Sequence, residues 1–206
     1  MKSTAVIIGY SGHAYVVIDA LLSNKFEIIG YCEQQQKAND PFKLQYLGKE
    51  GDSNLQELLK NNEVYIGIGD NKIRAKILNG LHSNSIACPV LVHASAIISQ
   101  TAKIGQGSVV LPGAVINSCA QVGKAVICNS SSVIEHECNV GDYCHIAPGA
   151  VLAGNVQVGP YSFIGANAVV KQGLVIGANV VIGAGAVVTK DIESGWVVYG
   201  NPAKRK

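Results

Sequence analysis

A six-residue repeat runs through residues 96–191 without an insertion, and it restricts the possible folds of this part of the chain more than any other feature. A helix with 3.6 residues per turn cannot keep such a period, whereas a short strand followed by a corner can. Hexads of this kind are typical of a parallel β-helix, in which the third side chain of each hexad is buried on the axis. Fifteen of the sixteen third positions are aliphatic and one is a cysteine, in the series Ile98, Ile104, Val110, Ile116, Val122, Cys128, Ile134, Val140, Ile146, Leu152, Val158, Ile164, Val170, Ile176, Ile182 and Val188.

The distribution of charge divides the chain near residue 95. Residues 96–191 carry eight charged side chains, and the other 110 residues carry 22. We therefore predict one domain over residues 1–88 and a second, with a C-terminal tail, over residues 89–206. The 206 residues are 48% apolar and 15% charged, with a net charge of +2. Charge this sparse and balanced gives no reason to expect nucleic acid binding.

The sequence shows no signal for export or membrane insertion. The first apolar stretch is too short for a secretory signal, and a glycine turn interrupts it. Residues 143–170 carry no charge, but prolines and glycines interrupt them too often for a membrane span. The six cysteines form neither a CxxC pair nor a metal-ligand spacing with histidine. We expect reduced thiols, no bound metal and a cytoplasmic location.

The first half of the chain alternates between two patterns. Short β-rich runs give way to stretches with helical apolar spacing, and this βαβαβα order predicts a small parallel sheet in an α/β domain. The expected strands and helices cover, in order, residues 5–8, 15–22, 27–31, 54–59, 64–68 and 72–81.

A glycine-containing turn, GYSGH at residues 9–13, follows the first expected strand and opens the first helix. Backbone N–H groups in this setting can hold a phosphate, although an ordinary strand–helix turn explains a GxxG motif equally well. Glu33 comes 24 residues after Gly9, at the end of the second strand, where an acidic residue often meets a ribose or a base. A domain of about 80 residues lacks the second half of a dinucleotide fold, so a nucleoside diphosphate fits better than NAD.

His136 is the clearest anomaly in the repeat, because it stands between Glu135 and Glu137 where other corners are mostly small or uncharged. An adjacent carboxylate can raise the basicity of an imidazole and fix its tautomer, as a general base requires. A solvated corner with a harmless charge cluster is the alternative. Because only eight charges occur in the repeat, we favour a functional role.

Five segments, GYSGHA, GIGDNKIR, SSVIEHEC, CHIAPGAVLAGNVQVG and GNPAK, occur in the same order in one protein family. The chain resembles, over nearly its whole length, the bacterial nucleotide-sugar acyltransferases of the hexapeptide-repeat class. This family includes UDP-4-amino-sugar N-acetyltransferases, which the chain resembles most, GDP-perosamine N-acetyltransferases and sialic acid O-acetyltransferases. The resemblance implies a small Rossmann-like domain followed by a left-handed parallel β-helix with three hexads per coil.

The resemblance also implies roles for residues in the repeat. His136 matches the general base that takes a proton from the sugar amine, and Glu137 matches the carboxylate that supports this base. His145 matches a residue that contacts acetyl-CoA from the neighbouring subunit. Backbone contacts with acetyl-CoA are implied for Ala166 and Ala184.

In the first domain, the resemblance implies a turn that holds the phosphates and a backbone contact at the end of the third strand. Glu33 and Gln34 stand where the family usually has an Asp-Asp pair that meets the nucleobase. This departure leaves the identity of the base open. The phosphate turn and the backbone contact correspond to Ser11, Gly12, His13 and Gly69.

His136 and His145 are nine residues apart, which is half of an eighteen-residue coil. At ~3.3 Å per strand residue, they should lie more than ~10 Å apart on different sides of one β-helix. They can then cooperate only across a subunit boundary, which closed cyclic symmetry supplies. We therefore expect a homotrimer with active sites at the subunit interfaces.

The preferred interpretation is an acetyl-CoA-dependent N-acetyltransferase acting on a nucleotide-activated 4-amino-4,6-dideoxy sugar, most simply a UDP-sugar, in glycan biosynthesis. In that mechanism the amine attacks the thioester directly, so Cys138 and Cys144 are expected to pack in the wall. One alternative is O-acetylation of sialic acid or a related sugar. A zinc hydratase would need three histidine ligands where the repeat offers two. The charged corner and the nucleotide-type domain argue against a non-enzymatic scaffold.

Overall fold

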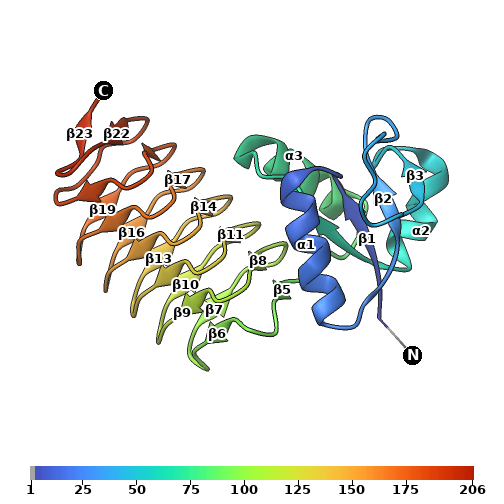
Figure 1. Cartoon of the computed structure of the whole chain (residues 1–206), viewed down its shortest axis with the longest axis horizontal. Helices are drawn as coiled ribbons and strands as arrows, with labels where there is room; N and C mark the ends of the chain where they lie inside the picture. Colours follow the sequence, from blue (N-terminus) through green and yellow to red (C-terminus); the bar gives the residue numbers. More distant parts are fainter. Residues whose placement is uncertain (1–2) are drawn as a thin grey trace.

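The computed structural model describes residues 3–206, and it divides into an α/β unit and a β-helix that lie side by side along the molecule (Figure 1). The α/β unit holds a four-stranded parallel sheet in the order β3-β2-β1-β4. Its elements are β1 (Thr4–Ile8), α1 (Gly12–Ser23), β2 (Glu27–Cys32), β3 (Tyr46–Gly48), the 3₁₀ helix η1 (Ser53–Leu55), α2 (Gln56–Lys60), β4 (Glu63–Ile66) and α3 (Asn71–Ser83).

The central strand β1 is buried on both faces from Ala5 to Ile8, which explains why these four residues are all apolar. Ala5 and Ile7 pack with α1 on one face, and Val6 and Ile8 pack with α2 and α3 on the other. The expected Rossmann-like arrangement is confirmed, with helix and strand ends shifted by a few residues. The sequence did not indicate β3, because a strand of three half-buried residues carries almost no periodic signal.

The second unit is a parallel β-helix built from three flat sheets (Figure 1). Between residues 91 and 188, each strand pairs in parallel with the strand eighteen residues away, as Val133 does with Val151, so three hexads make one coil. In the last coil, Val197 pairs with Val181, sixteen residues earlier, and residues 204–205 pair antiparallel with residues 198–199. Its strands are β5 (Leu91–Val92), β6 (Ile97–Ile98), β7 (Lys103–Ile104), β8 (Val109–Val110), β9 (Val115–Ile116), β10 (Gln121–Val122), β11 (Ile127–Cys128), β12 (Val133–Ile134), β13 (Asn139–Val140), β14 (His145–Ile146), β15 (Val151–Leu152), β16 (Gln157–Val158), β17 (Phe163–Ile164), β18 (Val169–Val170), β19 (Val175–Ile176), β20 (Val181–Ile182), β21 (Val187–Val188), β22 (Val197–Tyr199) and β23 (Lys204–Arg205).

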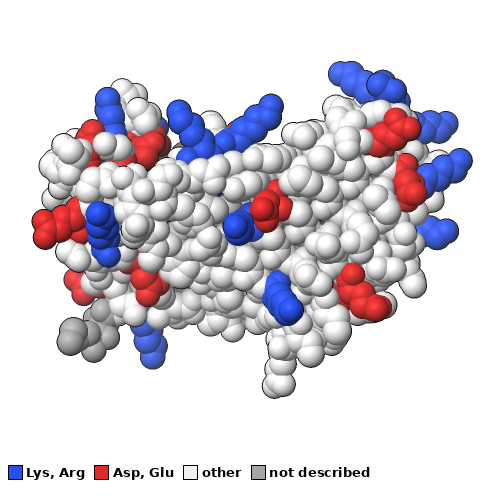
Figure 2. Space-filling view, turned by 180° about the vertical axis from the view of Figure 1, so that it is seen from behind, with Lys and Arg blue, Asp and Glu red and all other residues white. Residues whose placement is uncertain are grey.

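The third positions of the hexads form the core of this left-handed β-helix, as expected. All are buried except Ile98 and Ile104, which are half-buried in the first coil. The β-helix starts one strand before the first hexad of the repeat, because β5 already pairs with β8. On the face seen in Figure 2, much of the surface carries no charge, in keeping with the charge-poor repeat.

Arg74 joins the two units, and it is the largest fully buried side chain among the described residues. Its guanidinium donates to the carbonyls of Ala125 (2.7 Å), Tyr143 (2.9 Å) and Cys144 (3.1 Å) in the β-helix. It also donates to the carbonyl of Gly69 in its own unit, at 2.9 Å. Burial lowers the pKa of Arg74 to about 10, so the group stays charged at neutral pH. A buried cation held by carbonyls from both units fixes how they sit together.

Across residues 3–206, no helix has the length and apolar character needed to span a bilayer.

Candidate active site

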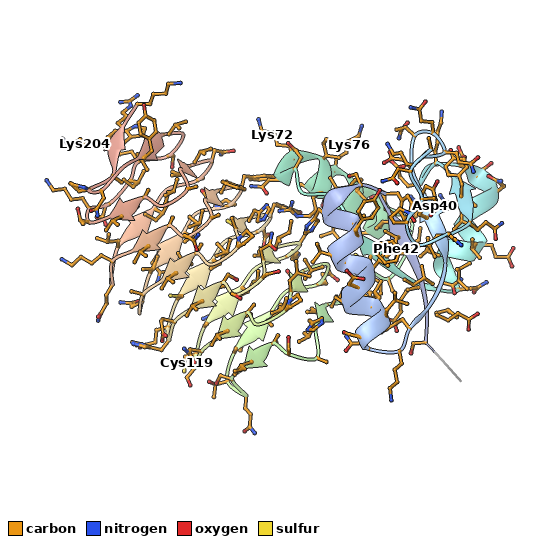
Figure 3. The ribbon with its side chains drawn as sticks, in the orientation of Figure 1. Asp40, Phe42, Lys72, Lys76, Cys119 and Lys204 are labelled. Carbon is orange, nitrogen blue, oxygen red and sulfur yellow. The ribbon has the colours of Figure 1, made fainter. Side chains whose placement is uncertain are left out.

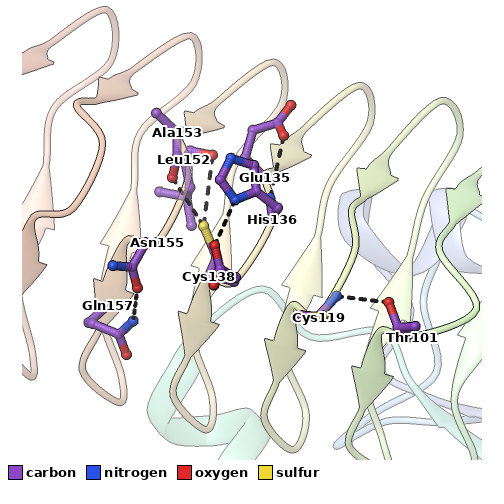
Figure 4. A network of polar contacts seen from close by, with 10 residues as sticks. Thr101, Cys119, Glu135, His136, Cys138, Leu152, Ala153, Asn155 and Gln157 are labelled. Carbon is purple, nitrogen blue, oxygen red and sulfur yellow. Dashed lines mark hydrogen bonds and ion pairs between the residues drawn. The ribbon is translucent and has the colours of Figure 1, made fainter.

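His136 and Glu137 form a charged corner between β12 and β13. The Nδ1 atom of His136 lies 3.1 Å from Oε2 of Glu137, and the two side chains are 52% and 65% exposed. Figure 4 shows the imidazole on the outside of the coil, close to Glu135 and above Cys138. If Nδ1 donates its proton to Glu137, Nε2 is left as a free acceptor at the surface. That is the tautomer a general base requires.

The backbone of Glu137 is left-handed, with φ of +62°. Every sixth position of the hexads from Gly107 to Gly185 has a positive φ, and glycine or asparagine occupies most of them. A left-handed conformation costs a non-glycine residue about 1–2 kcal/mol. The turn itself does not call for a glutamate at this position, and the carboxylate of Glu137 contacts the ring of His136.

His145 lies in β14, and the structure brings it close to His13 at the start of α1. The two ring centroids are 6.1 Å apart, and the side-chain amide of Asn129 donates to Nε2 of His145 at 3.0 Å. Nε2 of His13 is buried without a hydrogen-bond partner among residues 3–206. Burial, followed by the positive charge of Arg74, lowers the pKa of His13 to about 4 and that of His145 to about 3. Both imidazoles are therefore neutral at neutral pH.

We expect these two histidines to make the stability of the protein depend on pH. The folded chain binds fewer protons than the unfolded chain between the lowered pKa values and the ordinary value of 6.5. The free energy of unfolding should then be highest above pH 6.5 and fall as the pH is lowered. One pKa unit is worth about 1.4 kcal/mol, so the loss by pH 4 should reach several kcal/mol.

Denaturant unfolding at pH 7 and at pH 4, at one protein concentration, measures this loss. The double variant His13→Asn/His145→Asn should show a clearly shallower dependence. A dependence as steep as that of the unchanged protein would assign the effect to other groups.

The turn after β1 requires a glycine at residue 9. Gly9 has φ of +92°, and a Cβ atom there would lie 2.7 Å from a side-chain carbon of Ile68. Ser11 is the N-cap of α1, and its side chain makes no capping hydrogen bond. The N-terminus of this twelve-residue helix therefore offers backbone N–H groups and a free hydroxyl to an anion. A cavity of about 280 Å³ opens here, at the carboxyl ends of the strands.

Glu33 and Gln34 line the same cavity, next to Gly9 and Ser11. The carboxylate of Glu33 accepts from the backbone N–H groups of Gln34 (2.9 Å) and Tyr10 (3.4 Å) and pairs with Lys37 (3.3 Å). Burial works against ionisation of Glu33, but these three contacts outweigh it and lower its pKa. Glu33 is thus already well bonded, while the side chain of Gln34 is exposed at the rim.

A larger cavity of about 650 Å³ adjoins the first and shares Gln34, Glu50, Ile73 and Ile77 with it. It extends between η1 and α3 and reaches Gln56, whose buried Oε1 has no partner within residues 3–206, and Lys76, which projects from α3 in Figure 3. Sequence reasoning missed Glu50, Gln56, Ile73 and Lys76. Glu50 lies just past the end of β3, so recognising that strand would have pointed to it.

The remaining expected site residues lie in two further places. Gly69 approaches His13, and its carbonyl already accepts from Arg74 at 2.9 Å. Ala166 and Ala184 lie one coil apart on the corner that follows the sheet of His145, and the backbone N–H of Gly185 donates to the carbonyl of Ala166 at 2.8 Å. Gly12, the first residue of α1, is exposed beside Ser11.

A single chain therefore does not assemble all expected site residues. His136 and Glu137 lie on the corner after β12, in the six-stranded sheet, whereas His145 belongs to the eight-stranded sheet. The structure joins His145, His13 and Gly69 at the seam between the two units, a contact that the sequence did not indicate. It groups Ser11, Glu33 and Gln34 around the smaller cavity.

Cys138 and Cys144 are close to His136 in sequence, and both are fully buried. Burial raises the pKa of Cys144 to about 12, which opposes formation of a thiolate nucleophile. Within residues 3–206, no group of three or more His, Cys, Asp and Glu side chains is arranged to hold a metal ion.

Comparisons with known proteins agree with this architecture. Residues 4–81 match the family described as the PglD N-terminal domain, and residues 155–190 match the bacterial transferase hexapeptide family. A comparison with curated protein sequences finds no match.

Solved structures match over the whole chain. The acetyltransferase domain of PglB from Neisseria gonorrhoeae is 32% identical, with all of both chains covered and a TM-score of 0.92, and it has also been solved with acetyl coenzyme A. PerB from Caulobacter crescentus, in complex with CoA and GDP-perosamine, is 31% identical, with 99% of this chain and 97% of that chain covered and a TM-score of 0.90. WeeI from Acinetobacter baumannii is 25% identical over all of both chains, with a TM-score of 0.87. With identities above 30% over full-length chains, the protein belongs to the nucleotide-sugar acetyltransferase family, in which a PglD-type N-terminal domain precedes hexapeptide repeats.

Proposed function

We propose that the protein transfers the acetyl group of acetyl-CoA to the amine of a nucleotide-linked 4-amino-4,6-dideoxy sugar. The observation that carries this proposal is the His136 corner, where Nδ1 contacts Glu137 and Nε2 makes no hydrogen bond with any of residues 3–206. The relative from Caulobacter is called a perosamine N-acetyltransferase, and two further structures of it carry a single histidine replaced by asparagine or by alanine. The six cysteines, all free, and the use of acetyl-CoA support a cytoplasmic location.

His136 acts as the general base in the proposed reaction. Its Nε2 takes the proton from the amine while the amine nitrogen attacks the thioester carbonyl. The amide C–N bond forms as the C–S bond breaks, and the proton passes on to the leaving thiolate. Glu137 orients the imidazole and stabilises its charged form. No thiolate of the protein is needed for direct transfer, in keeping with the buried Cys144.

The nucleotide is proposed to bind the α/β unit. The diphosphate would lie at the N-terminus of α1, at Ser11, Gly12 and His13, where free N–H groups and the helix dipole favour negative charge. The adjoining cavity of about 650 Å³ is large enough for a nucleoside, and Gln34 connects the two spaces. Acetyl-CoA would lie along the β-helix, at the corner of Ala166 and Ala184.

The assembly is proposed to be a homotrimer with its active sites between subunits. The outward positions of the six-stranded sheet are all aliphatic; two of them, Ile97 and Val169, are exposed and the other four are half-buried. By contrast, the outward positions of the five-stranded sheet are mostly polar. In the eight-stranded sheet, α1 covers the first strands, β5, β8 and β11. An apolar ladder of this length favours burial against further copies of the chain, and His136 lies on the corner beside it. The ladder consists of Ile97, Val115, Val133, Val151, Val169 and Val187.

An acetylation assay tests the proposed function. We expect acetyl-CoA-dependent gain of one acetyl group on a UDP-, GDP- or dTDP-linked 4-amino sugar, measured by mass spectrometry of the products. The nucleotide that serves best should also raise the thermal unfolding midpoint, because a ligand at 100 times its Kd stabilises by ~2.7 kcal/mol. Acetylation of sialic acid or another hydroxyl acceptor alone would instead make the protein an O-acetyltransferase.

A further inference from the structure

The fifth position of the hexads is a glycine only once, at Gly154. The side chains at the other fifth positions range from alanine to lysine, so the backbone conformation of the corner does not require a glycine. Gly154 has no left-handed φ, and alanine occurs naturally at three fifth positions. The fifteen other fifth residues are Gln100, Gln106, Pro112, Ser118, Lys124, Ser130, His136, Asp142, Pro148, Pro160, Ala166, Gln172, Ala178, Ala184 and Lys190.

The neighbour that explains this glycine is His136, which occupies the same corner one coil earlier. A Cβ atom at residue 154 would lie 2.5 Å from both Cε1 and Nε2 of His136, and 3.3 Å from its Cδ2. The Cε1–Nε2 edge of the imidazole therefore occupies the space that a side chain at residue 154 would fill. Its other edge contacts Glu137, at 3.1 Å from Nδ1.

We propose that Gly154 is a positioning residue for His136: by lacking a side chain it lets the imidazole lie over the next coil and aim Nε2 along the outer wall. This inference rests on the proposed function, in which Nε2 of His136 takes the proton of the amine. Glu137 contacts the ring at Nδ1, and the opposite edge of the ring packs over the backbone of Gly154. Together they set the direction from which an amine can approach.

An alanine at residue 154 would disturb the ring more than the fold. Heavy atoms at 2.5 Å cannot coexist, so one of them has to move. His136 is a half-exposed side chain with rotatable bonds, whereas the corner backbone is held by hydrogen bonds such as the one from Asn155 N–H to the His136 carbonyl, at 2.8 Å. The imidazole ring should therefore rotate away from residue 154, and Nε2 should move out of the position from which it takes the proton of the amine. A displacement of about 1 Å can cost roughly 10²-fold in rate.

A double-mutant cycle in the full-length protein tests the proposal. The four proteins are the unchanged chain, Gly154→Ala, His136→Ala and the double variant, with Gln100→Ala as a control on the same corner two coils away from His136. Gly154→Ala should lower kcat at least ~10-fold, with KM for both substrates changed less than ~2-fold and the thermal unfolding midpoint nearly unchanged. In the His136→Ala background the same substitution should change the slow residual rate less than ~2-fold. Gln100→Ala should behave as the unchanged protein.

Two results would overturn the inference. One is near-normal turnover by Gly154→Ala. The other is the same fold-loss in both backgrounds, which would show that residue 154 acts independently of His136, through binding or folding. If the proposed function itself is wrong, the results differ from these two. The unchanged protein would then fail to acetylate an amino sugar, or His136→Ala would be fully active.

Discussion

Replacing His136 by alanine should lower kcat by roughly 10²- to 10⁴-fold, the range usually lost with a general base. The fold should survive, because the side chain is 52% exposed at a corner and contributes nothing to the axial core. Initial rates with acetyl-CoA and the best amino-sugar acceptor measure the loss, and circular dichroism with gel filtration checks the fold. Binding of acetyl-CoA should be retained.

A neighbouring substitution provides the matched control for this experiment. Glu135→Ala removes a carboxylate from the same corner that contacts only the backbone N–H of His136, at 3.4 Å, and not its ring. It should cost far less than His136→Ala. A folded His136→Ala protein with close to normal turnover would remove His136 from the mechanism.

Mixing two inactive variants should restore about a quarter of the activity if His136 and His145 act from different subunits. His136→Ala and His145→Ala chains would be unfolded and refolded together at equal amounts. About three quarters of random trimers are then mixed, and each mixed trimer regains one complete site of three. Activity of the refolded mixture relative to the unchanged protein, treated in the same way, is the measurement.

This experiment depends on His145→Ala being strongly impaired by itself, so each variant is first refolded alone. The two separate samples, combined after refolding without exchange, serve as the control and should stay inactive. Absence of recovery in trimers shown by mass spectrometry to be mixed would contradict a shared site. It would place the work of both histidines within one chain or leave His145 without a catalytic role.

More of the structure could be predicted from the sequence in the β-helix than in the α/β unit. In the β-helix every coil repeats the same local geometry, so one periodic pattern predicted the strands, the core residues and the corner of His136. In the α/β unit the strands buried on both faces were recognisable, while β3 was missed because its three residues are only half-buried. The cavity residue Glu50 follows that strand, and it was missed for the same reason.

In the candidate site, too, some contacts could be predicted from the sequence and others could not. His136 and Glu137 are neighbours in sequence, so their contact could be predicted from the sequence alone. The clearance at Gly154 lies one coil away and follows from the eighteen-residue period once the ring's direction is known. The approach of His13 to His145, with the Arg74 guanidinium between the two units, joins segments that no periodic pattern relates.

The sequence by itself determined what depends on local geometry: the β-helix with its buried third positions, the parallel sheet of the α/β unit, the glycine-containing turn before the first helix and the charged corner at His136. Only the tertiary structure decided how the two units dock, which histidines lose their protons by burial, and which side chains line the cavities. The physical reason is that docking depends on surfaces formed by residues distant in the chain. A repeat, by contrast, satisfies its hydrogen bonds and buries its core against its own nearest coils.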